Sequence, residues 1–290
     1  MKNLDLSTLP AKKRKQIVSC LRAGIQLLYF LFLPSVFTAA FNGVKYIFTQ
    51  LGQGEKIEMT AFVSALLLVC AFTIVFGRFF CGFACAFGSL GDAMHAIYGI
   101  ICKKRKKKSR CIKPELAKKL VLIKYGILLL IALCCFAGVY QKARGTSPWD
   151  VFSMLHAGNF RLSSYIPGIV LLVLILVGMF FEERFFCRFL CPMGAVFSLL
   201  PILPFFTLHR KRENCIRGCS ACTRQCPSAV ELPSDGYVEI SGDCFQCQKC
   251  IDTCPKGNIR CGVKELHGNE ILFTLFRAVF LLTLLLWAGI

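Results

Sequence analysis

Residues 244–255 read Cys-Phe-Gln-Cys-Gln-Lys-Cys-Ile-Asp-Thr-Cys-Pro, so four cysteines at C-x2-C-x2-C-x3-C spacing precede a proline. An earlier run, Cys215-x3-Cys219-x2-Cys222-x3-Cys226-Pro227, has one extra residue between its first two cysteines. Closely spaced thiolates of this kind hold three corners of a cubane iron–sulfur cluster, and the distant Cys-Pro supplies the fourth ligand. The two runs therefore predict a small α+β module of the bacterial 2[4Fe–4S] ferredoxin type.

The same spacing rule predicts which cysteines share a cluster, because the fourth cysteine of each run ligates the cluster of the other run. The first cluster is expected on Cys215, Cys219, Cys222 and Cys254. The second is expected on Cys244, Cys247, Cys250 and Cys226. Structural zinc is the main alternative, but zinc favours two pairs of ligands over two four-cysteine runs that end in proline. Disulfides are disfavoured because the segment is expected in the reducing cytoplasm.

A shorter cysteine motif occurs twice, as RFFCGFACAFG at 78–88 and as RFFCRFLCPMG at 184–194. Seven of the eleven positions are identical, at an offset of 106 residues. Each copy follows one apolar segment and precedes a broken one. This pattern predicts a two-fold internal repeat in which both copies lie on the same side of a membrane.

The cysteines of this repeat predict a further redox or metal site. Cysteines four residues apart share one face of a helix, so each copy would direct two thiols the same way. If the copies pack about a pseudo-twofold axis, four thiols meet at the membrane edge: Cys81, Cys85, Cys187 and Cys191. A further iron–sulfur cluster or soft metal, a redox dithiol and a thiol relay all remain open. The structural alternative is that these cysteines are small packing residues.

Composition places the rest of the chain in a membrane. Hydrophobic residues make up 56% and charged residues only 18%, against about a quarter charged in soluble domains. A helix needs roughly 17–25 apolar residues to cross a bilayer. Five segments qualify: 17–41, 60–80, 120–140, 162–181 and 271–290. Two broken apolar segments, 86–102 and 195–208, are expected to be interfacial or half-depth helices.

The charge of the chain, +19 from 35 basic and 16 acidic residues, predicts its orientation. Basic residues cluster before the first predicted span, after the second and after the fourth, which lie on one side of an alternating topology. The expected protein is therefore a multi-pass protein of the cell inner (cytoplasmic) membrane, with its N-terminus and ferredoxin module in the cytoplasm. Arg22, Lys124 and Arg277 lie near span ends and are expected to snorkel. No base-reading element accompanies the charge, so nucleic acid is not an expected partner.

The chain is thereby divided into six segments. They are a basic N-terminal arm (1–16), a first membrane repeat with Cys-x3-Cys (17–102), a basic loop (103–119), a second membrane repeat with Cys-x3-Cys-Pro (120–208), a 2[4Fe–4S] ferredoxin domain (209–270) and a C-terminal transmembrane helix (271–290).

These features resemble the NapH-type membrane ferredoxins, the polyferredoxin-like family of 4Fe–4S binding membrane proteins. The resemblance rests on the repeated Cys-x3-Cys after an apolar span, on Cys191-Pro192 and on the two ferredoxin runs, and it covers most of residues 15–260. Ala86 departs from the pattern, because proline usually follows the first Cys-x3-Cys. The resemblance implies an electron conduit between membrane quinol or a flavoprotein and a redox partner.

The expected function is membrane-anchored electron transfer between the two cytoplasmic clusters and the membrane-edge site, with quinone or a partner redox complex as the terminal partner. The chain would then be an electron carrier or oxidoreductase subunit rather than a stand-alone enzyme. One alternative is a maturation factor that reduces a metal such as copper for a metalloenzyme. Another is an iron–sulfur redox sensor. No hydrolase, dinucleotide-binding or P-loop motif is present.

Overall fold

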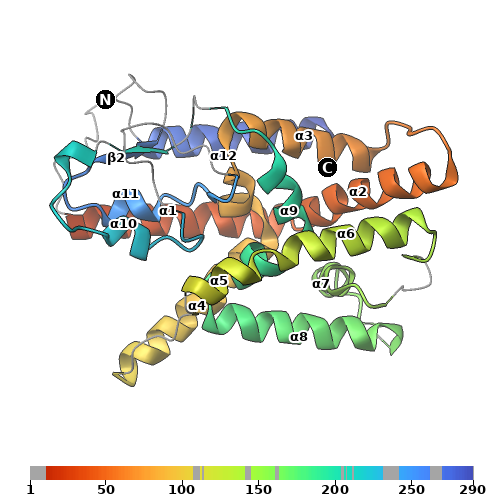
Figure 1. Ribbon diagram of the computed structural model, residues 1–290, viewed down its shortest axis with the longest axis horizontal. Coiled ribbons are helices and arrows are strands. Elements are labelled where there is room, and N and C mark those ends of the chain that lie inside the picture. The colour runs from red at the N-terminus through yellow and green to blue at the C-terminus, as the bar shows by residue number, and fades with distance from the viewer. Residues whose placement is uncertain are drawn as a thin grey trace.

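The computed structural model describes residues 11–106, 112, 114–140, 145–160, 163–203, 206, 208–210, 212–230, 242–261 and 270–289. This part of the chain is mostly helical (Figure 1). The α-helices are α1 (Ala11–Phe32), α2 (Val36–Gln53), α3 (Ala61–Phe76), α4 (Ala86–Lys104), α5 (Pro114–Leu120), α6 (Ile123–Phe136), α7 (Pro148–His156), α8 (Ile166–Phe181), α9 (Pro192–Leu199), α10 (Ala221–Arg224), α11 (Lys249–Thr253) and α12 (Glu270–Trp287). There are also two π-helical turns, η2 (Phe80–Ala84) and η5 (Phe186–Leu190), and two 3-10 turns, η4 (Ser163–Tyr165) and η6 (Arg212–Asn214). The two strands are β1 (Leu208–Arg210) and β2 (Ile259–Cys261).

The first predicted span is not one helix. Helix α1 ends at Phe32 and α2 begins at Val36, and the two axes differ by 61°. Pro34 lies in the break, where its ring and missing N–H prevent the helix from continuing. The predicted span over 17–41 is therefore broken at Pro34, and α1 with α2 forms either a broken span or a re-entrant pair.

Among the described residues, two helical stretches are long and apolar enough to cross a membrane, Glu115–Phe136 and Ser163–Phe181. The bent α1–α2 pair makes a third if it counts as one span. Helix α3 has 16 residues, which at about 1.5 Å per residue is shorter than a hydrocarbon core of about 30 Å. Helix α12 is likewise a shorter apolar helix. The five predicted segments are thus all helical, and five complete spans remain a prediction.

The helices form a bundle with the cysteine-rich elements at one end (Figure 1). Helix α2 packs against α3 and α6, while α8 packs against α4 and α7. Elements α10, α11 and β2 lie beside α1, at the left in Figure 1. Strands β1 and β2 pair antiparallel, with His209 opposite Arg260, so a small α+β module does form in the predicted ferredoxin segment.

Aromatic side chains fill the core where the two RFFC copies meet. Phe87 of α4 lies against Phe186 of η5, with ring centroids 5.0 Å apart. Phe80 of η2 meets Phe197 of α9 edge to face at 6.2 Å. Such pairs favour fixed ring geometries beyond their simple burial. The same core includes Phe245 of the cysteine-rich module, so the module and the helices share one buried interior.

Candidate functional site

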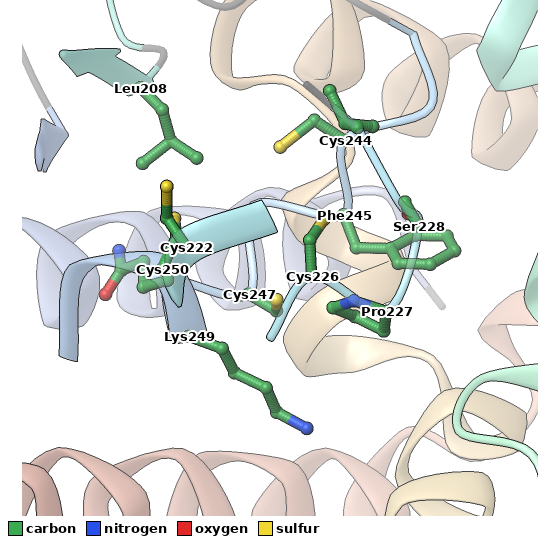
Figure 2. A pocket seen from close by; sticks show the side chains of 12 residues that line it. Leu208, Cys222, Cys226, Pro227, Ser228, Cys244, Phe245, Cys247, Lys249 and Cys250 are labelled. Carbon is green, nitrogen blue, oxygen red and sulfur yellow. The ribbon is translucent and has the colours of Figure 1, made fainter. Parts of the chain in front are cut away.

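The second predicted cluster site is a cavity. A space of about 410 Å³ is lined by five cysteines, Cys222, Cys226, Cys244, Cys247 and Cys250. Figure 2 shows these side chains around the cavity with Leu208 and Phe245. The cavity therefore brings together the four cysteines expected to hold the second cluster, and it is also lined by Cys222, which the spacing rule assigns to the first cluster.

Two of the four residues of the first predicted cluster, Cys215 and Cys254, contact Asn258. Its backbone N–H donates to the Cys254 sulfur at 3.3 Å, and its side-chain amide donates to the Cys215 sulfur at 3.8 Å. One asparagine thus bridges cysteines from opposite runs that the rule assigns to one cluster. Cys219 is exposed. The extra residue of the first run is accommodated at Gly218, whose φ of +73° is a left-handed conformation that glycine adopts readily.

Thiolates are the ligands of a [4Fe–4S] cluster, and each binds a different iron corner of the cubane. The cavity is lined by five cysteine side chains, so its donor set fits such a cluster.

The two Cys-x3-Cys motifs adopt the same backbone path. Each first cysteine lies in a π-helical turn, and the turns close with Cys85 N–H donating to Phe80 O at 2.8 Å and Cys191 N–H donating to Phe186 O at 2.9 Å. The prediction of one α-helical face for each pair is wrong, because each second cysteine is extended and caps the helix that follows. π-Helical turns are rare in proteins, and those that occur often lie at functional sites.

We call Cys81, Cys85, Cys187 and Cys191 the four-cysteine site. All four side chains are buried in one core cluster. Burial, with neighbouring charges, raises the pKa of the Cys187 thiol to about 11, and burial raises the pKa of the Cys191 thiol well above its ordinary value. The Gly194 N–H, in the first turn of α9, donates to the Cys191 sulfur at 3.1 Å. The Cys187 and Cys191 thiols therefore favour the protonated form in the bare protein, although the N-terminus of α9 favours the Cys191 thiolate.

Two fully buried arginines flank this site. Arg184 donates to Asp92 at 2.8 Å and to the Gly82 carbonyl at 2.9 Å. Burial alone would raise the pKa of the Asp92 carboxyl, but attraction to Arg184 reverses this and holds the pKa below its ordinary value. Arg78 donates to Ser198 at 3.2 Å and to the Gly242 carbonyl at 3.1 Å.

Replacing Asp92 with asparagine is expected to lower the apparent free energy of unfolding by about 3–5 kcal/mol, because Arg184 would stay buried without its carboxylate. Thermal unfolding of the purified protein in one detergent measures the difference. Glu58→Gln is the matched control, because Glu58 is exposed. A loss below about 1 kcal/mol, the value of a surface pair, would contradict a buried ion pair at this position.

The segment 242–247, which we call the docking loop, joins the cysteine-rich module to the helices. Lys124 donates to Asp243 at 2.6 Å and to Ser198 at 2.8 Å. A β-carbon on Gly82 would overlap the carbonyl oxygen of Phe245. The docking loop is therefore seated against η2 with no room for a side chain between them.

Comparison with known proteins finds similarity in the two regions that carry the Cys-x3-Cys copies. A family model described as a 4Fe-4S binding domain matches residues 59–109 and 166–207, and each match contains one Cys-x3-Cys copy. The ferredoxin-type protein NapH of Haemophilus influenzae is 24% identical over 72% of this chain and 70% of its own length. The resemblance to NapH-type ferredoxin proteins is confirmed.

Other relatives extend the comparison. The putative electron transport protein YccM of Escherichia coli is 25% identical over 77% of this chain and 62% of its own length. An uncharacterized protein of Methanocaldococcus jannaschii, MJ0750, is 27% identical over 83% of this chain and 93% of its own. No solved structure is significantly similar to the chain.

The burial of three charged residues was not predicted from the sequence. Arg22, Lys124 and Arg277 were expected to snorkel, yet their exposed fractions are 8%, 1% and 0%. Arg22 lies 3.6 Å from Asp252 of α11, and Lys124 binds the docking loop. The prediction of snorkelling is therefore wrong, because Arg22 and Lys124 contact the cysteine-rich module and Arg277 lies against the rings of Phe79 and Phe273. The repetition of arginine at the start of both RFFC copies was the available signal for the buried pair.

Proposed function

We propose that this chain is a membrane-anchored electron-transfer protein with two [4Fe–4S] clusters in segment 209–270 and a further redox site on the four-cysteine site. The first cluster would use Cys215, Cys219, Cys222 and Cys254. The second would use Cys244, Cys247, Cys250 and Cys226. Such clusters supply one-electron transfer when bound. The names of NapH, a ferredoxin-type protein, and YccM, a putative electron transport protein, support this class of function.

The observation that carries the proposal is the contact between the docking loop and η2. Cys247 lines the second cluster cavity and also belongs to the same buried core cluster as the four cysteines. Phe245, two residues earlier, lies against Gly82, which follows Cys81. A cluster held in that cavity would thus adjoin the four-cysteine site.

The protonated state of the bare thiols favours a metal-bound role over thiol–disulfide exchange. A thiol whose pKa is about 11, as at Cys187, is almost entirely neutral at pH 7 and is a poor nucleophile. Bound iron would supply the positive charge that converts such thiols to thiolates. We therefore place a further iron–sulfur or soft-metal centre here rather than a redox dithiol.

The terminal partner would be quinone or a redox protein, and a reoxidation experiment tests this. Protein reduced anaerobically with dithionite is mixed with a water-soluble quinone analogue or with Cu(II), and the return of visible absorbance is followed. Faster reoxidation by the quinone supports electron transfer to quinone. Faster reoxidation by Cu(II) would support a metal-reducing maturation factor, and slow reaction with both would support a sensor.

We further propose that the N-terminal arm, the loop 103–119 and the ferredoxin segment lie in the cytoplasm, with the chain in the inner membrane. The basic residues in the last turn of α4, Lys103 and Lys104, support this side by the positive-inside rule. A reporter fused after Lys106 is expected to be active inside the cell, and one fused after Gly54 on the opposite side. The reverse result would contradict the orientation.

A further inference from the structure

The two arginines that open the RFFC copies reach across to the opposite copy. A β-carbon on Gly88, in the first copy, would lie 2.6 Å from Nη1 of Arg184. A β-carbon on Gly194, in the second copy, would lie 3.0 Å from Nη2 of Arg78. Each guanidinium therefore occupies space that only a glycine of the other copy leaves open. We call Arg78 and Arg184 the crossed arginine pair.

Both arginines face the same ring of the docking loop. The guanidinium carbon of Arg78 lies 4.8 Å from the ring centroid of Phe245, and that of Arg184 lies 5.7 Å from it. Cations at these distances from an aromatic face are attracted to it, most strongly where water is excluded. Phe245 lies between Cys244 and Cys247, two of the expected ligands of the second cluster. The crossed arginine pair thus contacts the loop that would carry that cluster.

The backbone at Arg184 is held in an unfavourable conformation. Its φ is +58°, a left-handed value that is unfavourable for a non-glycine residue. Such a conformation persists where surrounding contacts determine it. Here the contacts are the bonds of Arg184 to Asp92 and to the backbone carbonyls of Cys81 and Gly82.

Among the described residues that pair with the crossed arginines, cations exceed carboxylates by one. The cations are Arg78, Arg184 and Lys124, and the facing carboxylates are Asp92 and Asp243. A further buried cation, Arg277, lies against the ring of Phe79 in the first copy. Other charges nearby are matched within their own pairs: Arg22 with Asp252, Arg188 with Glu182, and Lys249 with Glu183. Nη2 of Arg78 is also 3.9 Å from the Cys81 sulfur. This balance favours an anionic occupant, because an unmatched buried cation is costly.

We propose that the two residues of the crossed arginine pair are positioning residues with two effects. They hold Phe245 against the four-cysteine site, and they favour the reduced, more negative state of the iron–sulfur centre beside them. This inference rests on the proposed function, since it requires a redox centre at this interface. The fixed positive charges stabilise each added electron, so their removal makes the centre harder to reduce. The forked geometry of arginine matters as well, because lysine keeps the charge but cannot make the same set of bonds.

The test compares Arg78→Gln, Arg184→Gln and the corresponding lysine variants with Arg188→Lys. Arg188 adjoins Cys187 in the same motif but pairs with Glu182 and stacks on Phe189 rather than Phe245. Each full-length protein, purified anaerobically in lipid nanodiscs, is titrated with dithionite while the iron–sulfur signals are followed by electron paramagnetic resonance (EPR). Iron per chain is measured on the same samples.

We expect each glutamine variant to keep its iron and to shift at least one centre tenfold toward the oxidised form, which is about 59 mV for one electron. The lysine variants should recover part of this shift, and Arg188→Lys should leave the potentials unchanged. Unchanged potentials with full iron in the glutamine variants would overturn the inference. Equal loss of iron from the glutamine and lysine variants would overturn it too, because it would indicate a purely structural role. Failure of the proposed function is distinguishable, because it appears as missing iron in the unmodified protein.

Discussion

Replacing Cys226 with serine is expected to reduce the iron content from about eight to about four per chain and to remove one of two EPR signals. Cys226 belongs to the first run, yet it lines the cavity formed by Cys244, Cys247 and Cys250 of the second run. Loss of this one thiol therefore removes the fourth corner of the second cluster. Cys254→Ser should have the corresponding effect on the other signal, because Cys254 shares Asn258 with Cys215.

The matched control for this prediction is Cys261→Ser. Cys261 is a buried cysteine of β2 in the same module, and its sulfur lies 3.7 Å from the Gln246 side chain. It belongs to neither predicted ligand set, so its replacement should leave both signals and the iron content unchanged. Full iron in Cys226→Ser, or loss of iron in Cys261→Ser, would contradict the ligand assignment.

Adding a single methyl group at Gly82 is expected to separate the docking loop from the four-cysteine site. In Gly82→Ala the new β-carbon would overlap the Phe245 carbonyl oxygen, which is backbone and cannot rotate away. Overpacking of this kind costs about 1–3 kcal/mol, so the loop should move while both clusters stay bound. Electron transfer slows as the distance between two centres increases. We therefore expect quinone-analogue reoxidation of the reduced protein to slow several-fold.

Gly99→Ala provides the control, because a β-carbon at this position on α4 would meet no atom within 4 Å. That variant should keep the iron content and the reoxidation rate of the unmodified protein. Reoxidation of Gly82→Ala at the normal rate with its iron intact would contradict the role proposed for the contact between Gly82 and Phe245. Equal slowing of both variants would contradict it too.

Cysteine spacing gives the most specific prediction about the site, because the ligands of a cluster are close in sequence and their cross-pairing follows a known rule. Cys226 lines the same cavity as Cys244, Cys247 and Cys250, but Cys222 lines it too, so the assignment of ligands to the two clusters stays a prediction. The apolar segments were also located correctly, since helices appear in all five. The bend at Pro34 was underestimated, because a proline inside a long apolar stretch can kink a helix or end it.

The buried charges could not be predicted from the sequence alone. Lys124 lies at the start of an apolar stretch, where snorkelling to the membrane surface is the usual behaviour. Its partner Asp243 is 119 residues away, in the docking loop. Nothing in the local pattern indicates that the loop returns to cover it. The π-helical turns at Cys81 and Cys187 were missed for a related reason, since they depend on the packing of one copy against the other.

The most direct test of the account is the metal content and redox behaviour of the full chain, purified anaerobically in lipid nanodiscs. Iron, zinc and acid-labile sulfide are quantified per chain, and EPR follows a dithionite titration. We predict about eight irons with matching sulfide from the ferredoxin segment, additional iron if the four-cysteine site holds a cluster, and signals that appear reversibly on reduction. About four irons or fewer, or one zinc per cysteine run, would contradict the electron-transfer function proposed for this protein.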